Sequence, residues 1–331
     1  CELLSRPEVG AVDDFFALGG HSLLATRLAS RIRYRYQIEF NVRQIFNFPI
    51  LRDLAQQIDH LVAHGRDDFN QLGIDVRDDE RAFWPLSFSQ QRLWFLDHLE
   101  SDNRAYHLPQ LLRIRGQLDV VTLEMALGEV VRRHEILRTT FSDLEGQAVQ
   151  QIHDTIVLDF AVLKVVSESL LQQQLDDCLN LPFDLATGPL FRVRVFCNKQ
   201  ESLLFINWHH IIADGWSMEV LLEEMTALYG AFVKGQPSPL SAVPRQYADY
   251  AVWQREVLNE DFWQQQRTYW SQQLAGVEPL SLPADHPQPK QRRLHGNSLS
   301  VRIPAELLKS LRELSATQGA TLFMTLLSAF Q

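Results

Sequence analysis

Residues 203–217 read LLFINWHHIIADGWS, and this stretch decides the fold of the larger part of the chain. The apolar run over residues 203–208 predicts a short buried strand. The periodic residues that follow predict a helix over 217–232. A strand, a loop and a helix in this order are typical of a mixed α/β domain, and the loop between them is a place where a scaffold holds side chains rigidly.

Helices and strands alternate on both sides of this stretch, from Phe83 onward. Apolar periodicity predicts helices over residues 89–99 and 118–133, a long helical region through Trp270, and a helical tail from Ala305. Short runs rich in apolar residues predict strands over residues 111–115, 136–141, 149–152 and 190–196, with a turn at Gly146.

The first sixty residues predict a different, all-α unit. Apolar residues recur every four positions at Leu24, Leu28 and Ile32, which places them on one face of a helix. A second helix is expected just after Pro49. Residues 64–82 are charged and lack this periodicity, so we interpret them as a linker.

Composition excludes several classes of protein. The 331 residues include 41 acidic and 31 basic side chains, a net charge of −10, without the basic stripe of a nucleic-acid binder. No apolar run approaches the ~18 residues that span a membrane, and the first residues do not resemble a signal peptide. Three cysteines predict neither a disulfide framework nor a metal site. We therefore expect a cytoplasmic protein with no metal and no membrane or nucleic-acid partner.

Ser22 is the first candidate functional residue, because two glycines precede it and a predicted helix begins there. A serine at that position is favoured as an N-cap. It is also where the helix dipole and free N–H groups favour a phosphate, so a phosphodiester could be attached to it. Helix geometry alone does not separate the two interpretations.

The surrounding residues resemble a known motif. Residues 18–23, Leu-Gly-Gly-His-Ser-Leu, preceded by Asp-Phe-Phe at 14–16, closely resemble the attachment motif of peptidyl carrier proteins from nonribosomal peptide synthetases. The resemblance covers residues 1–63 and implies a small helical bundle whose first helix is expected to be cut short. It also implies that Ser22 carries 4′-phosphopantetheine, whose thiol holds an aminoacyl or peptidyl group. The implied partners are an upstream adenylation domain and a phosphopantetheinyl transferase.

His209 and His210 are the second candidate site, since they lie in the loop between the buried strand and the helix. A neutral imidazole there could accept a proton from an attacking amine or hydrogen-bond it. Backbone N–H groups near Gly215 and Ser217 could stabilise an oxyanion. From the spacing alone, a core histidine beside a helix-capping Asp214 is the favoured interpretation, because a histidine four residues before an aspartate occurs three times in the chain.

The segment from His209 to Ser217 resembles the active-site motif of synthetase condensation domains, which share the fold of chloramphenicol acetyltransferase. Three further segments resemble core motifs of the same family, in the same order: residues 87–94, 133–141 and 247–254. The resemblance implies a condensation domain over residues 83–331, with a first lobe at about 83–260 and the start of a truncated second lobe at 261–331.

The resemblance also implies roles for single residues. His210 matches the catalytic histidine, as a general base or as a group that positions the amine, and Gly215 leaves room for substrate beside it. Asp214 matches an aspartate that an arginine holds, with Arg138 as the expected partner and Arg133 as the second choice. His209, Trp216 and Ser217 would shape the loop.

The expected reaction is amide-bond formation between the thioester on this carrier and an aminoacyl thioester on a downstream acceptor carrier, within a multimodular enzyme that makes a secondary metabolite. An ester-forming domain, or a non-catalytic docking module in this truncated form, are the alternatives. Heterocyclisation domains replace both histidines with aspartates, so His209 and His210 argue against that reaction.

Overall fold

The computed structural model describes most of the chain. The described residues are 2–4, 6, 8–20, 22–36, 38, 40–64, 74, 77, 81–99, 104–197, 201–281, 283, 285 and 299–331. The chain divides into two compact units, one formed by residues 74–294 and the other by residues 1–73 with 295–331. We call residues 74–294 the α/β body.

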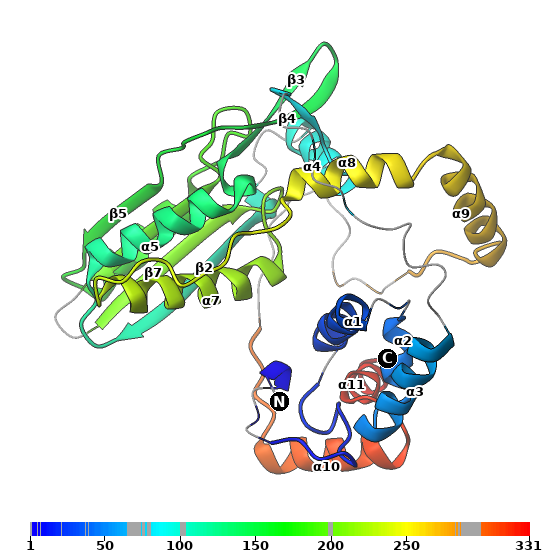
Figure 1. Cartoon of the computed structure of the whole chain (residues 1–331). Coiled ribbons are helices and arrows are strands. Elements are labelled where there is room, and N and C mark those ends of the chain that lie inside the picture. The colour runs from blue at the N-terminus through cyan, green and yellow to red at the C-terminus, as the bar shows by residue number, and fades with distance from the viewer. Residues whose placement is uncertain are drawn as a thin grey trace. The chain divides into compact units, whose positions relative to one another are not determined.

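The N-terminal helical bundle consists of α1 (Ser22–Tyr36), α2 (Val42–Asn47) and α3 (Leu51–His64) (Figure 1). Its core gathers apolar side chains from the helices and from the segments between them. The buried members are Phe15, Ala25, Ala29, Ile32, Ile38, Phe40, Ile45 and Leu54. The two predicted helices are confirmed as α1 and α3. The short α2 was not predicted, although the reciprocal hydrogen bonds of Asn41 and Gln44 form a capping box that marks its start.

The α/β body is built on two sheets. The larger has the order β2-β7-β6-β5, in which β5 and β6 are parallel and the other pairs antiparallel. Its strands are β2 (His107–Arg115), β5 (Asp159–Lys164), β6 (Phe191–Cys197) and β7 (Glu201–His209). The smaller sheet has the order β1-β4-β3. Its strands are β1 (Trp84–Pro85), β3 (Thr139–Leu144) and β4 (Gln147–Ile152).

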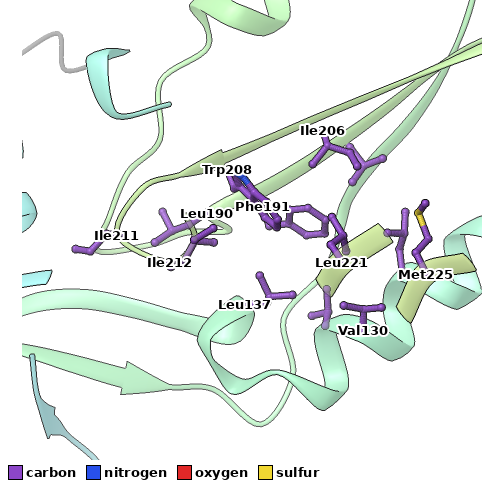
Figure 2. Packing of buried hydrophobic residues seen from close by; sticks show 14 of the residues in the cluster. Val130, Leu137, Leu190, Phe191, Ile206, Trp208, Ile211, Ile212, Leu221 and Met225 are labelled. Atoms are coloured by element: carbon purple, nitrogen blue, oxygen red, sulfur yellow. The ribbon is translucent and has the colours of Figure 1, made fainter. Parts of the chain in front are cut away.

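Helices cover the middle of the larger sheet on both faces. On one face, α5 (Val120–Arg133) and α7 (Gly215–Phe232) lie side by side and share one core with β6 and β7 (Figure 1). In that core the rings of Phe191 and Trp208 lie 5.6 Å apart, beside Leu221 and Met225 of α7 (Figure 2). On the other face, Cys178 of α6 (Glu168–Asn180) packs with Phe205 of β7. Burial on both faces explains why β7 is a continuous apolar run in the sequence.

Several predicted elements differ in the structure. Residues 136–138 were predicted as strand, and this is wrong: they belong to a 3-10 turn, Glu135–Arg138, and β3 begins at Thr139. The hydroxyl of Thr139 donates to the carbonyl of Glu135 at 2.8 Å and closes this turn. The strand β5 and the helix α6 were not predicted.

The predicted long helical region is broken into α8 (Tyr247–Val257) and α9 (Glu260–Gln273). The side chain of Asn259 accepts from the amide of Phe262 and starts the second helix anew. The remaining helix of the body, α4 (Phe88–Leu99), was predicted almost to the residue.

The tail forms a helical hairpin of α10 (Ala305–Thr317) and α11 (Leu322–Phe330). The hydroxyls of Ser315 and Thr325 join the two helices at 2.7 Å. Among the described residues, no helix is both long and apolar enough to cross a membrane. The same residues contain no group of three or more histidines, cysteines or acids arranged to hold a metal ion.

Candidate functional site

Ser22 is the first residue of α1, and the turn before it fixes where that helix starts. Asp14 caps the turn by accepting from the amide of Phe16 at 2.7 Å, and the amide of Gly20 donates to the carbonyl of Phe15 at 2.9 Å. A Cβ on Gly20 would lie 2.4 Å from the Phe15 ring, which is 1% exposed, so only glycine fits there.

The start of α1 also fits a phosphodiester on Ser22. The first turn of α1 holds no acidic side chain, so no carboxylate there competes for its free N–H groups. The predicted neighbour His21 lies outside the described residues.

His210 lies just past the end of β7, with its amide donating to the carbonyl of Tyr106 at 2.8 Å. Its ring Nδ1 lies 2.8 Å from the carbonyl oxygen of Ala213. A carbonyl only accepts, so this bond requires the proton on Nδ1 and leaves the lone pair on Nε2. The side chain is exposed, so Nε2 is available as an acceptor for an incoming amine.

His209 has the opposite tautomer. Its Nδ1 accepts from the amide of Ile211 at 3.1 Å, which places its proton on Nε2. The ring is 1% exposed, and burial, together with His107 and His210 nearby, lowers the pKa of His209 to about 3. His209 therefore stays neutral and supports the loop from inside, while His210 faces outward.

Asp97 of α4 is the acidic group beside His209, with its Oδ1 4.0 Å from Nε2. Burial raises the pKa of Asp97. The Nε2–H of His209 makes no hydrogen bond within the described part of the chain. Sequence reasoning missed Asp97 because its position on α4 gives no hint that it faces the histidine loop.

Asp214 caps α7. Its Oδ1 accepts from the amide and the hydroxyl of Ser217, at 2.9 and 2.7 Å, and its own amide donates to that hydroxyl at 3.0 Å. A Cβ built on Gly215 meets no heavy atom of the described residues within 4 Å, so the space beside the loop is open there. Trp216 is half-buried in the first turn of α7.

The expected arginine partner of Asp214 is not found in the described structure. Arg138 lies on the 3-10 turn and donates to backbone carbonyls, those of Val131 and of His153 among them. The turn directly follows α5, and Nη2 of Arg138 also donates to the carbonyl of Arg132 in that helix. Arg133 binds elsewhere too, so Asp214 acts as a helix cap, and this corrects the pairing predicted for it.

Arg133 instead holds the middle of α7. Its Nε and Nη2 donate to the two carboxylate oxygens of Glu224 at 3.1 and 3.3 Å, and His134 Nε2 lies 2.9 Å from the same carboxylate. Burial opposes ionisation of Glu224, but the bonds from Arg133 and His134 outweigh it and lower its pKa. These contacts fix α7, and with it the loop that carries His210, against the end of α5.

Comparison with known proteins shows the family of the chain. The model of the condensation domain family matches residues 80–331, and the model of the phosphopantetheine attachment site matches residues 1–58. The chain belongs to the condensation domain family. It carries a phosphopantetheine attachment site ahead of that domain, and the matched residues include Ser22.

The relatives of this carrier and condensation domain are peptide synthetases. A linear gramicidin synthase of Brevibacillus parabrevis is 43% identical over 339 residues, covering 100% of this chain and 6% of the relative. Tyrocidine synthase 3 of the same organism is 35% identical over 334 residues, covering 99% of this chain and 5% of the relative. The chain thus spans a small part of the length of its curated relatives.

A solved structure shares the fold of the condensation domain. The X-domain in a complex with OxyB from teicoplanin biosynthesis is 32% identical, with a TM-score of 0.65, and the match covers 75% of this chain and 55% of that chain. The mixed α/β fold expected for the condensation domain, and the helical carrier ahead of it, are confirmed.

Proposed function

We propose that this chain is the peptide-bond-forming part of a nonribosomal peptide synthetase. The carrier, residues 1–63, holds the donor as a thioester on the phosphopantetheine of Ser22. After the linker at 64–82, the condensation domain at 83–331, with a first lobe at about 83–260 and the start of a second at 261–331, joins that donor to an aminoacyl group on a downstream acceptor carrier.

The observation that carries this proposal is the tautomer of His210. In amide formation, the nitrogen of the acceptor amine attacks the thioester carbonyl, a C–N bond forms and the C–S bond breaks. The amine must lose a proton, and the departing thiolate takes one up. Nε2 of His210, with its lone pair turned outward, can accept a hydrogen bond from the amine and either orient it or take its proton.

The neighbouring residues support that role. The bond from Nδ1 to Ala213 keeps the His210 ring in one orientation, and the cap at Asp214 keeps the loop closed onto α7. On this proposal, backbone N–H groups at the start of α7 other than that of Ser217, which Asp214 binds, would stabilise the oxyanion on the thioester carbonyl. The open side of Gly215 gives the substrate room, and His209 and Trp216 maintain the shape of the loop.

The carrier implies further partners. An upstream adenylation domain would supply the aminoacyl group, and a phosphopantetheinyl transferase would modify Ser22. The thiol of the arm must stay reduced to carry a thioester, so we place this chemistry in the cytoplasm. An acceptor hydroxyl in place of the amine would give an ester by the same steps.

A docking function is the second candidate. The teicoplanin X-domain shares this fold and was solved in a complex with another protein, OxyB. On that alternative, the condensation domain binds carriers or other synthetase domains without catalysing transfer.

Intact-protein mass spectrometry separates the two candidates. Ser22 is loaded with an aminoacyl-phosphopantetheine by a transferase, and an aminoacyl acceptor on a separate carrier is added. Transfer by the wild type and its loss in His210→Ala support catalysis. The matched control is His98→Ala, because the exposed His98 also bonds a backbone carbonyl through Nδ1 but lies on α4. Loading without transfer in the wild type would leave the docking function, and equal transfer by both variants would refute the role of His210.

A further inference from the structure

Arg77 connects the end of the linker to residues far along the chain. Its backbone N–H and its Nη1 both donate to Oδ1 of Asp249, at 3.2 and 2.9 Å, and its Nη2 donates to Oε2 of Glu135 at 2.5 Å. Its guanidinium also lies over the ring of Trp84, 4.9 Å from the centroid. Nearby, Arg245 Nε donates to the carbonyl of Ile74. The chain is thus fastened at residues 74 and 77.

The carboxylate of Asp249 and the backbone of Glu135 are held in place by further hydrogen bonds. Asp249 is the third residue of α8, and its Oδ2 accepts from the amide of Gln246 at 2.7 Å. The side chain of Gln246 in turn accepts from the amide of Glu135 at 3.1 Å and donates to the carbonyl of Arg133 at 2.9 Å. The start of α8 and the 3-10 turn therefore form a preorganised acidic receptor.

The side chains of this receptor are buried enough that their carboxylates require the positive charge of Arg77. The side chain of Arg77 is 6% exposed, that of Asp249 is 2% exposed and that of Glu135 is 23% exposed. A buried carboxylate without a cation is strongly disfavoured. The planar guanidinium stacks on an aromatic ring and binds two carboxylates at once. A lysine ammonium could not do both, so lysine would be a poor replacement here.

We propose that Arg77 is the anchor of the carrier's tether, and hence a positioning residue for delivery of the donor; the role in delivery rests on the proposed function. Ten residue steps separate the end of α3 at His64 from Ile74, so the covalent connection reaches at most about 36 Å. If the bonds of Arg77 and the bond from Arg245 to Ile74 are both removed, the next fixed point is Trp84, which pairs with Gln150 in the smaller sheet. The connection then doubles to twenty steps and about 70 Å.

This difference changes the concentration at which the condensation domain meets its own carrier. Effective concentration falls roughly as the −3/2 power of tether length, so doubling the length lowers it about threefold. Arg77 acts on the delivery of a tethered donor and leaves the chemistry at His210 untouched. A donor that is free in solution should not depend on the anchor.

The test compares the double variant Arg77→Gln/Arg245→Gln, which removes both fastenings, with the wild-type chain, and Arg81→Gln serves as the matched control. Arg81 lies over the same Trp84 ring, at 5.8 Å, but is exposed. Transfer is measured once with the donor loaded on Ser22, and once with a soluble aminoacyl-pantetheine thioester in a Ser22→Ala background. We expect the double variant to slow the tethered reaction about threefold and to leave the soluble-donor reaction unchanged, with Arg81→Gln like the wild type in both. An equal loss in the two reactions would refute a positioning role.

The rate of amide hydrogen exchange near Arg77 tests the anchor and does not depend on catalysis. In the wild type, the amide of Arg77 is protected by Asp249, so a peptide covering residues 74–84 should exchange faster in Arg77→Gln and keep its rate in Arg81→Gln. Glu135→Gln is a milder second variant, because Glu135 is partly exposed, and it should give a smaller increase. Unchanged exchange in both Arg77→Gln and Glu135→Gln overturns the anchor. If the wild type transfers nothing, the proposed function fails, and this measurement still decides whether the anchor exists.

Discussion

Acid should destabilise the condensation domain through one buried histidine. His209 is neutral in the folded chain down to about pH 3, whereas its ordinary pKa of 6.5 applies once the chain unfolds. Between these two values the unfolded state binds a proton that the native state does not, so the free energy of unfolding falls as the pH falls. Each pH unit below 6.5 contributes about 1.4 kcal/mol, which gives about 2 kcal/mol lost between pH 7 and pH 5.

Urea unfolding at pH 7 and pH 5, followed by tryptophan fluorescence, measures this loss. All seven tryptophans lie between residues 84 and 270, so the signal reports the α/β body and not the carrier. His209→Gln is neutral at both pH values and should lose about 2 kcal/mol less than the wild type between them. The exposed His98→Gln is the control and should behave like the wild type. An equal loss in the wild type and in His209→Gln would show that His209 is not the group that excludes the proton.

Three further substitutions test single contacts. Asp214→Ala removes the cap of α7 and should lower the free energy of unfolding by about 1 kcal/mol, whereas Asp214→Asn keeps the acceptor and should cost clearly less. Equal losses in urea titrations would contradict the role of a cap. Glu224→Gln removes the charge that Arg133 binds and should cost about 2 kcal/mol by the same titration; a neutral outcome would mean that the pair does not hold α7. Gly20→Ala forces a Cβ against Phe15 and should destabilise the carrier by about 1–3 kcal/mol or more. Amide NMR spectra of the carrier resonances would show the loss of fold, and an unchanged spectrum would refute the steric argument.

Local patterns were enough to predict the strand, loop and helix around His210. The apolar run of β7, the glycine at 215 and the periodic residues of α7 each carry a signal within a few residues. The same kind of signal was present but overlooked for α6, where Ser167 accepts from the amide of Leu170 and caps the helix. Residues 136–138 misled the prediction because apolar content alone does not distinguish a strand from a tight turn.

The polar contacts of the site could not be predicted from local pattern. Adjacent histidines look alike in the sequence, yet their tautomers differ because one ring meets an amide of its loop and the other a carbonyl. Arg77 and Asp249 lie 172 residues apart, and nothing near either residue indicates the other. Arg138 was expected to reach Asp214, but its place in the fold is set by the 3-10 turn, which directs it to backbone carbonyls. Such pairs depend on tertiary packing, so they appear only in the structure.

The three side chains of the segment Arg133-His134-Glu135 bind two different partners. Arg133 and His134 bind Glu224 and hold the helix that follows the loop of His209 and His210, while Glu135 binds Arg77. The histidine loop, which would receive the donor, and the tether, which would deliver it, are therefore both held by residues 133–135. It follows that Ile74 and Arg77 are bonded to residues of the condensation domain. If the carrier is replaced by another one through a junction before residue 74, the bonds of Arg77 to Asp249 and Glu135 are kept. A junction after Arg77 removes this arginine from its acidic receptor.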